Sequence, residues 1–243
     1  MRVAIISDIH ANLEALEAVI KEIQSLSVDL VACLGDVVGY GSNPDECCSL
    51  VREHCDFCLL GNHDAAVTGA MDEAYYYDAA RNALRWTRDQ LDDDNYKWLY
   101  SLPYSHLDGE LAYFHSAPIM PSGFFYVVQA NEAQTHVQIF DRLKSISFIG
   151  HAHLTSVFSV TAKKAKSSDA KHVALREGTR YIVNVGSVGQ PRDRDPRSCF
   201  VIWDSEDETL QYVRVEYDIE SAAAKILAAN MDEKFAKRLY LGV

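Results

Sequence analysis

The sequence predicts an α/β (α+β) fold, a four-layer αββα sandwich in which two mixed β-sheets pack face to face between helices. Two observations predict it. The first part of the chain alternates apolar runs of strand length with helical patterns, and beyond Ile149 the sequence turns to strands separated by turn signals. No linker or repeat divides the 243 residues, so we expect one domain over residues 1–243.

The expected strands are short apolar runs, rich in β-branched and aromatic residues. The first group comprises residues 3–6, 30–34, 57–60, 111–114 and 146–149. The second group comprises residues 157–160, 172–175, 181–185, 200–203 and 210–215. Between the first two runs of this second group, the polar stretch 163–170 is expected to be a mobile hairpin tip.

The expected helices follow from apolar residues at helical spacing and, at Pro44, from a typical first-turn proline. They are residues 12–26, 44–52, 74–91, 95–102 and 219–241, the last as one or two helices. Asp92, Asp93 and Asp94 are expected to separate the third helix from the fourth. We expect the stretch 72–102 to be a helical cap insert over the site described next.

The runs of the first group all end in residues that bind metal ions. The motifs are Asp8-Ile9-His10, Gly35-Asp36, Gly61-Asn62-His63-Asp64, His115-Ser116 and Gly150-His151-Ala152-His153. A lone Asp-x-His has a simpler explanation, such as a surface carboxylate or a hydrogen-bonded core histidine. Five motifs at five strand ends can instead meet in one crevice. Carboxylates, imidazoles and one amide suit Mn, Fe, Zn or Ni rather than a thiolate site.

In this order the motifs resemble those of the calcineurin-like metallophosphoesterase superfamily, over residues 1 to about 200. Segments 35–41 and 184–192 resemble its compact prokaryotic phosphodiesterase-like branch. The resemblance implies two divalent metal ions, with Mn²⁺ favoured in vitro. It assigns the first ion to Asp8, His10, Asp36 and His153. It assigns the second to Asp36, Asn62, His115 and His151, so that Asp36 bridges both.

The same resemblance implies hydrolysis of phosphodiester or phosphoanhydride bonds in a small, nucleotide-type substrate. Two cations roughly 3.5–4 Å apart provide a hydroxide at neutral pH and neutralise the phosphoryl oxygens during in-line displacement. His63, which is not a ligand in families of this kind, would stabilise the developing charge and protonate the leaving oxygen. Asp64 is expected to fix the His63 ring by a hydrogen bond.

The chain departs from the pattern of protein Ser/Thr phosphatases and symmetrical dinucleoside tetraphosphatases. Those enzymes carry Gly-Asp-x-x-Asp-Arg-Gly and an arginine before Gly-Asn-His-Glu, whereas this chain has Gly39-Tyr40-Gly41 and Leu60. Their phosphate clamp is therefore absent, which argues against a protein phosphatase. A substitute cation could come from Arg192 or Arg194. It could also come from the insert, where Arg81, Arg85 and Arg88 share one helix face, although a solvated face is the simpler interpretation.

Asn12 and Tyr126 are further candidates for substrate contact. Asn12 could touch a phosphate, but capping the first helix is the more common role of such an amide. Tyr126 follows Phe124 and Phe125 in a loop. These aromatics could stack on a nucleobase, worth roughly 1–3 kcal/mol per base, or they could pack the insert against the sandwich. Both alternatives are open at this stage.

Composition further restricts the partners and the location that we expect for this protein. The net charge is −12, with 35 acidic and 23 basic residues, which disfavours duplex nucleic acid as a partner. No apolar run is long enough for a membrane span or signal peptide, so we expect a cytoplasmic protein. The six cysteines are expected to be reduced core thiols, with a redox or metal role as the alternative. The histidines outside the motifs, His54, His106, His136 and His172, are expected at the surface or at helix ends.

Two other functions stay open. One is an asymmetric dinucleoside polyphosphate hydrolase, which the sequence does not separate from a phosphodiesterase. The other is a non-catalytic protein-binding scaffold of the same fold. Such scaffolds are expected to lose metal ligands or the leaving-group acid, whereas every one of those positions is filled here, so catalysis is preferred. The sequence does not determine the oligomeric state.

Overall fold

The first β-sheet has the strand order β11-β10-β1-β2-β3. Its strands are β1 (Arg2–Ile6), β2 (Leu30–Cys33), β3 (Phe57–Cys58), β10 (Ser198–Asp204) and β11 (Thr209–Val215). The first three run parallel to one another, while β10 pairs antiparallel with both β1 and β11. The computed structural model describes residues 1–168, 176 and 178–243.

The second β-sheet has the order β4-β5-β6-β9-β7-β8. Its strands are β4 (Ser105–Asp108), β5 (Leu111–Phe114), β6 (Ile146–Ile149), β7 (Thr155–Val160), β8 (Ala165–Ser168) and β9 (Arg180–Val185). Here β5, β6 and β9 are parallel, and the remaining pairs are antiparallel. Each sheet is thus mixed, and its parallel strands deliver their loops to one edge.

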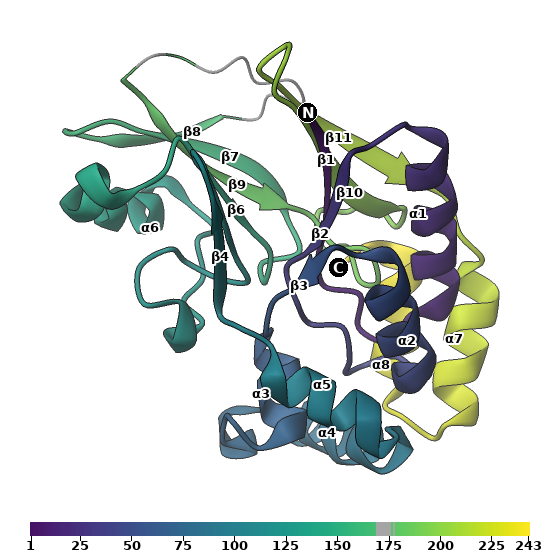
Figure 1. Cartoon of the computed structure of the whole chain (residues 1–243). Coiled ribbons are helices and arrows are strands. Elements are labelled where there is room, and N and C mark those ends of the chain that lie inside the picture. The colour runs from purple at the N-terminus through teal and green to yellow at the C-terminus, as the bar shows by residue number, and fades with distance from the viewer. Residues whose placement is uncertain (169–175, 177) are drawn as a thin grey trace.

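Helices cover the outer faces of both sheets (Figure 1). On the first sheet these are α1 (Leu13–Ser25), α2 (Pro44–His54), α7 (Ile219–Ala228) and α8 (Glu233–Leu241). On the second sheet they are the short α6 (Ala130–Gln134) and the 3₁₀ helix η3 (Thr135–Arg142). The predicted four-layer αββα sandwich is therefore confirmed. None of the helices in the described part of the chain is long and apolar enough to cross a membrane.

Strand alternation places the core in two layers. In β1, Val3 and Ile5 face the second sheet and pack in one cluster with Tyr113 and Phe148. Ala4 and Ile6 point the other way, into a cluster that includes Leu16 and Val19 of α1. Because β1 is buried on both faces, it reads as a continuous apolar run.

The predicted insert lies between β3 and β4. It follows α3 (Asn62–Thr68) and contains the 3₁₀ helix η1 (Glu73–Tyr75), α4 (Asp78–Gln90) and α5 (Asp93–Ser101). Asp92 is the N-cap of α5 and accepts a hydrogen bond from the Asn95 N–H at 2.6 Å. α4 ends at Gln90 and α5 begins at Asp93, so the acidic run marks the predicted break between two helices. Its last two residues form the first turn of α5, because carboxylates are favoured at a helix N-terminus.

Other boundaries differ from the prediction where the pattern is weak. β3 has only two residues, since the Leu60 N–H turns away to Pro103 O. β4, β8, α6 and η3 lack a clear apolar period and were not predicted. The predicted strand 172–175 and the end of the predicted hairpin tip 163–170 lie outside the described residues, as does His172. His136 is buried near the start of η3, so it lies at a helix end, one of its two predicted positions, and not at the surface.

Candidate metal centre

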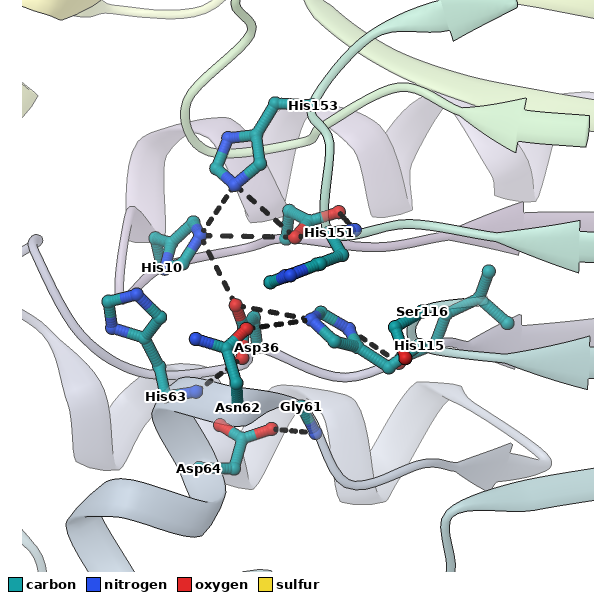
Figure 2. Close-up of polar contacts among 12 residues, drawn as sticks. His10, Asp36, Gly61, Asn62, His63, Asp64, His115, Ser116, His151 and His153 are labelled. Carbon is teal, nitrogen blue, oxygen red and sulfur yellow. Dashed lines mark hydrogen bonds and ion pairs between the residues drawn. The ribbon is translucent and has the colours of Figure 1, made fainter. Parts of the chain in front are cut away.

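The loops after the parallel strands of both sheets bring all seven predicted ligands together. They come from the loops after β1, β2, β3, β5 and β6. Figure 2 shows the side chains of His10, Asp36, Asn62, His115, His151 and His153 pointing toward one another. All seven are buried, namely Asp8, His10, Asp36, Asn62, His115, His151 and His153. Polar groups gathered at such depth are stable only with partners.

The backbone at this site is strained. Five of the predicted ligands adopt the left-handed conformation with φ of 51 to 65°, namely Asp8, His10, Asp36, His151 and His153. Non-glycine residues avoid this region at a cost of roughly 1–3 kcal/mol each, and such residues cluster where the surrounding structure enforces a functional geometry. Because the strained residues are themselves the predicted ligands, we infer that the loops adopt this conformation in order to place the ligand side chains.

The glycines of the motifs permit the close approach of these loops. A Cβ on Gly61 would lie 2.1 Å from Asp36 Oδ1, and a Cβ on Gly150 would lie 2.0 Å from Ser7 Oγ. Neither neighbour is the end of a long flexible side chain, so only glycine fits at these two positions. The glycines that precede Asn62 and His151 are thus part of the site's geometry.

One group of donors consists of Asp8, His10 and His153, whose ligand atoms lie close enough to hold one ion. The Nε2 atoms of His10 and His153 are 3.1 Å apart. The Nε2 atom of His153 is also 3.3 Å from Asp8 Oδ1. These distances show several electron-pair donors converging on one point.

A second group consists of Asp36, His115 and His151. Asp36 Oδ2 lies 3.4 Å from His115 Nε2 and 3.7 Å from His10 Nε2, so this carboxylate stands between the two groups. Asn62 Oδ1 is 3.2 Å from His115 Nε2. The predicted bridging position of Asp36 is consistent with this placement.

The imidazole tautomers show that the converging atoms need a cation. The Nδ1 atoms of His10, His115 and His153 lie within 2.6 to 3.2 Å of backbone carbonyl oxygens of Val38, Leu34 and Gln190. A carbonyl oxygen only accepts, so each Nδ1 carries a proton. In the neutral rings of His10 and His153, Nε2 therefore directs a lone pair inward. The buried Nε2 of His151 has no hydrogen-bond partner among the described residues. Facing lone pairs repel one another unless a positive charge lies between them, and divalent ions fit this donor set.

The charges in the cluster agree with this conclusion. Burial lowers the pKa of His10 and of His153 well below the ordinary value, so both rings are neutral. For His115 burial also lowers the pKa, but the Asp36 carboxylate outweighs it and raises the pKa to about 9. Burial raises the pKa of Asp8 to about 7. In the metal-free protein the cluster thus draws in protons to balance its carboxylates.

His63 lies beside the ligands, and its ring Nδ1 is buried without a hydrogen-bond partner in the described part of the chain. Its backbone N–H donates to Asp36 Oδ1 at 2.7 Å. The predicted hydrogen bond from Asp64 to this ring is wrong. Asp64 instead accepts from the N–H groups of Gly61 and Val38, at 3.1 and 3.2 Å, because it is the third residue of α3 and caps that helix.

Of the predicted substrate contacts, Asn12 has a structural role, whereas Tyr126 lies at the site. Asn12 caps α1, accepting from Ala15 N at 3.2 Å and donating to Gly189 O at 2.8 Å, so its amide serves the fold and not a phosphate. The Tyr126 ring stacks on His151 with centroids 3.8 Å apart, and 52% of Tyr126 is exposed. Phe124 is buried in one cluster with Leu60 and Ala65, which favours its packing role.

Arg192 is the candidate cation that reaches the site. Its guanidinium carbon is 5.9 Å from the centre of the Tyr40 ring, and that ring contacts His63 at 4.4 Å. Arg192 donates to Gln190 Oε1 at 2.8 Å and forms no ion pair with any residue that the structure describes. The arginines of the insert are occupied elsewhere: Arg81 pairs with Asp78, Arg85 with Glu73, and Arg88 donates to backbone carbonyls of α3. Arg194 is exposed.

Sequence reasoning missed two aromatic residues at the site. Tyr40 packs between His63 and Phe235 of α8. Tyr76 of the insert contacts His63 edge-on at 5.1 Å and bonds to Asn62. Tyr40 follows Gly39 directly, so its place in the second motif was the one available signal, whereas nothing in the sequence around Tyr76 indicates a site.

Comparison with known proteins agrees with the fold. The family model described as calcineurin-like phosphoesterase matches residues 1–184. An uncharacterized protein of Methanocaldococcus jannaschii is 36% identical over 244 residues, which cover 99% of this chain and 98% of that protein. The crystal structure of a metallophosphoesterase from Sphaerobacter thermophilus is 34% identical, with a TM-score of 0.84 and full coverage of both chains. A hypothetical protein from Pyrococcus horikoshii OT3 has the same fold, with 19% identity, a TM-score of 0.79 and coverage of 100% and 98%. The chain belongs to the calcineurin-like phosphoesterase family.

Proposed function

We propose that this protein is a dinuclear metal-dependent phosphoesterase that hydrolyses phosphodiester or phosphoanhydride bonds of a small, nucleotide-type substrate. The observation that carries the proposal is the inward orientation of the imidazole Nε2 atoms around Asp36, each ring fixed by a backbone carbonyl. In this proposal Asp8, His10, Asp36 and His153 hold one ion. Asp36, Asn62, His115 and His151 hold the other.

When bound, two divalent ions, with Mn²⁺ favoured in vitro, supply a hydroxide nucleophile and neutralise the phosphoryl oxygens. The chain's own contribution is to fix the donors. Backbone carbonyls hold the rings of His10, His115 and His153, and the strained loops leave these side chains little freedom. Such preorganisation lets the site bind the substrate without rearranging its donors.

His63 is the residue we assign to the leaving group. Its backbone is anchored to Asp36, and its ring lies between His10, Tyr40 and Tyr76 at centroid distances of 4.4 to 5.1 Å. Its Nδ1 is buried against Gly39 and has no hydrogen-bond partner among the described residues. We propose that the ring hydrogen-bonds the phosphoryl group and transfers a proton to the departing oxygen.

Arg192 is assigned to the substrate phosphate. It takes the place of the clamp arginines that the sequence lacks, because its guanidinium lies over Tyr40 and its charge, after burial, is among the causes that lower the pKa of His153. Tyr126 covers His151 and leaves part of its ring exposed. That surface is our candidate for contact with a base or other flat group of the substrate.

The first experiment compares initial rates on bis-p-nitrophenyl phosphate and p-nitrophenyl phosphate, with Mn²⁺ and with EDTA. Wild type is measured beside His63→Ala and beside His54→Ala, a half-buried histidine at the end of α2 that belongs to none of the ligand motifs. We expect turnover that favours the diester, stops with EDTA and is lost only in His63→Ala. Monoester preference would reassign the protein as a phosphatase.

The same assay separates the other two functions. Failure of metal-loaded wild type to exceed the His63→Ala background on either ester would reject general esterase activity. A panel of dinucleoside polyphosphates would then test the asymmetric hydrolase. Inactivity on that panel as well would favour the protein-binding scaffold.

A further inference from the structure

Tyr76 of the helical insert contacts the amide of Asn62, one of the predicted ligands of the second ion. The Tyr76 hydroxyl oxygen accepts a hydrogen bond from Asn62 Nδ2, with 2.5 Å between the two atoms. The other end of the amide, Oδ1, lies 3.2 Å from His115 Nε2. Tyr76 therefore holds the nitrogen end of this amide and leaves the oxygen end facing the ligand cluster, where Figure 2 shows the Asn62 side chain between His63 and His115.

The end of the amide that faces the cluster decides whether an ion can bind. The oxygen and the NH₂ group are nearly the same size, but only the oxygen offers a lone pair, whereas the NH₂ hydrogens repel a cation. Rotation by half a turn exchanges the two ends. A partner that accepts from the NH₂ group and lies away from the cluster therefore selects the orientation that binds metal.

The surroundings of Tyr76 suit it to this role. Its hydroxyl lies 3.8 Å from Met71 Sδ, toward which its own proton can point, so the oxygen lone pairs are available to Asn62. Its backbone N–H donates to Glu73 O at 3.0 Å, and the Glu73 carboxylate is held by Arg85 Nε at 2.8 Å. The position of the hydroxyl is thus tied to the insert.

We propose that Tyr76 is a positioning residue that orients the Asn62 amide, and that the insert thereby sets the affinity of the second metal site. The proposal rests on the two-ion function proposed above. A role in packing alone is the competing explanation, since the half-buried Tyr76 ring also contacts His63. Tyr76→Phe separates the two because it keeps the ring and removes only the hydroxyl.

The test titrates metal-free protein with MnCl₂ in a calorimeter and follows the Tm of each metal-free variant by circular dichroism. Wild type is compared with Tyr76→Phe and with Tyr77→Phe, a neighbouring tyrosine that is 51% exposed. We expect two ions on wild type. Tyr76→Phe should weaken one of them about 10- to 100-fold, as loss of a partner to a ligand commonly does, with the other ion and the Tm unchanged. Tyr77→Phe should match wild type.

Repeating the Tyr76→Phe comparison in an Asn62→Asp variant makes the test specific to the amide. In Asn62→Asp both ends of the side chain are oxygens, so no orientation has to be selected and the Tyr76→Phe penalty should shrink. An equal penalty in both backgrounds, equal weakening of both ions, or no penalty at all would overturn the role of Tyr76 and leave the two-ion centre standing. Wild type that binds fewer than two ions would overturn the two-ion function, and this inference with it.

Discussion

His10 and His153 lie 143 positions apart in the sequence, yet their Nε2 atoms meet at 3.1 Å with the rings stacked at 25°. Each ring presents its Nδ1 to a backbone carbonyl, so two lone pairs face each other in a buried site. This contact is unfavourable without a positive charge between the rings. We therefore expect metal binding to stabilise the fold as well as to support catalysis.

Metal removal should therefore destabilise the protein. Ligands that bind only the folded state stabilise it by about 2.7 kcal/mol at a hundred times Kd, which for a domain of this size raises the Tm by about 5–10 °C per ion. We expect the Tm of Mn²⁺-loaded protein to fall by at least this much when EDTA is added, measured by differential scanning calorimetry. Asp36→Asn should abolish the difference. Equal Tm values with and without EDTA in wild type would contradict the two-ion site.

Arg192→Gln should weaken substrate binding. A charge-assisted hydrogen bond contributes about 1.5–3 kcal/mol, so we expect KM for the preferred substrate to rise about tenfold or more while metal content stays the same. Steady-state kinetics and elemental analysis measure the two quantities. Arg194→Gln is the matched control, because that side chain is exposed. A similar KM in Arg192→Gln and Arg194→Gln would remove Arg192 from the substrate site.

Asp64→Ala should lower stability rather than alter the chemistry. Its buried carboxylate accepts from the N–H groups of Gly61 and Val38, and leaving such donors unpaired costs about 1–3 kcal/mol. We expect urea denaturation to show a loss of this size and the pH profile of kcat/KM to keep its shape. A shifted profile at unchanged stability would show that Asp64 acts on His63 after all.

The cysteines should resist thiol reagents until the protein unfolds. All six are free, and burial raises the pKa of Cys47, Cys48, Cys55 and Cys58 well above 9.0. We expect a disulfide-exchange reagent at pH 8 to modify almost no thiol in the native protein and all six in urea. Rapid modification of the native protein would instead support a redox role for these cysteines.

The thiols whose pKa is raised by burial should make the free energy of unfolding depend on pH, and the sign of this dependence can be worked out. Unfolded thiols lose their protons near pH 9.0, whereas the folded thiols keep theirs to higher pH. Above that pH the unfolded state binds fewer protons, so the free energy of unfolding is unaffected below about pH 9 and falls as the pH rises further. Urea midpoints measured from pH 7 to pH 10.5 test this. Cysteine-to-alanine variants should flatten the alkaline fall.

The sequence predicted the sandwich and the gathering of the ligands because both depend on pattern. Strand-length apolar runs identified the strands, and the general placement of sites at strand carboxyl ends brought His10 and His153 into one crevice. The limit of that approach appears at β3. An apolar run predicts a strand over residues 57–60, but the strand has two residues because the Leu60 N–H turns away to Pro103 O.

What the sequence could not predict are the contacts that depend on side-chain direction within loops. Asp64 follows His63 directly, and only the structure shows that its carboxylate turns to the start of α3 instead of the ring. Tyr76 lies fourteen positions from Asn62 in a tyrosine-rich stretch, where Tyr75 and Tyr77 are exposed and Tyr76 alone turns inward. No local period distinguishes it from its neighbours.

The division of the ligands between two sheets has a consequence for how the protein matures. Asp8, His10 and Asp36 follow strands of the first sheet, whereas His115, His151 and His153 follow strands of the second. The central strand β1 is completed on one side by β10, which follows every one of these donors in the chain. The donors therefore converge only when both sheets are assembled. We expect metal binding to follow the folding of both sheets rather than to precede it.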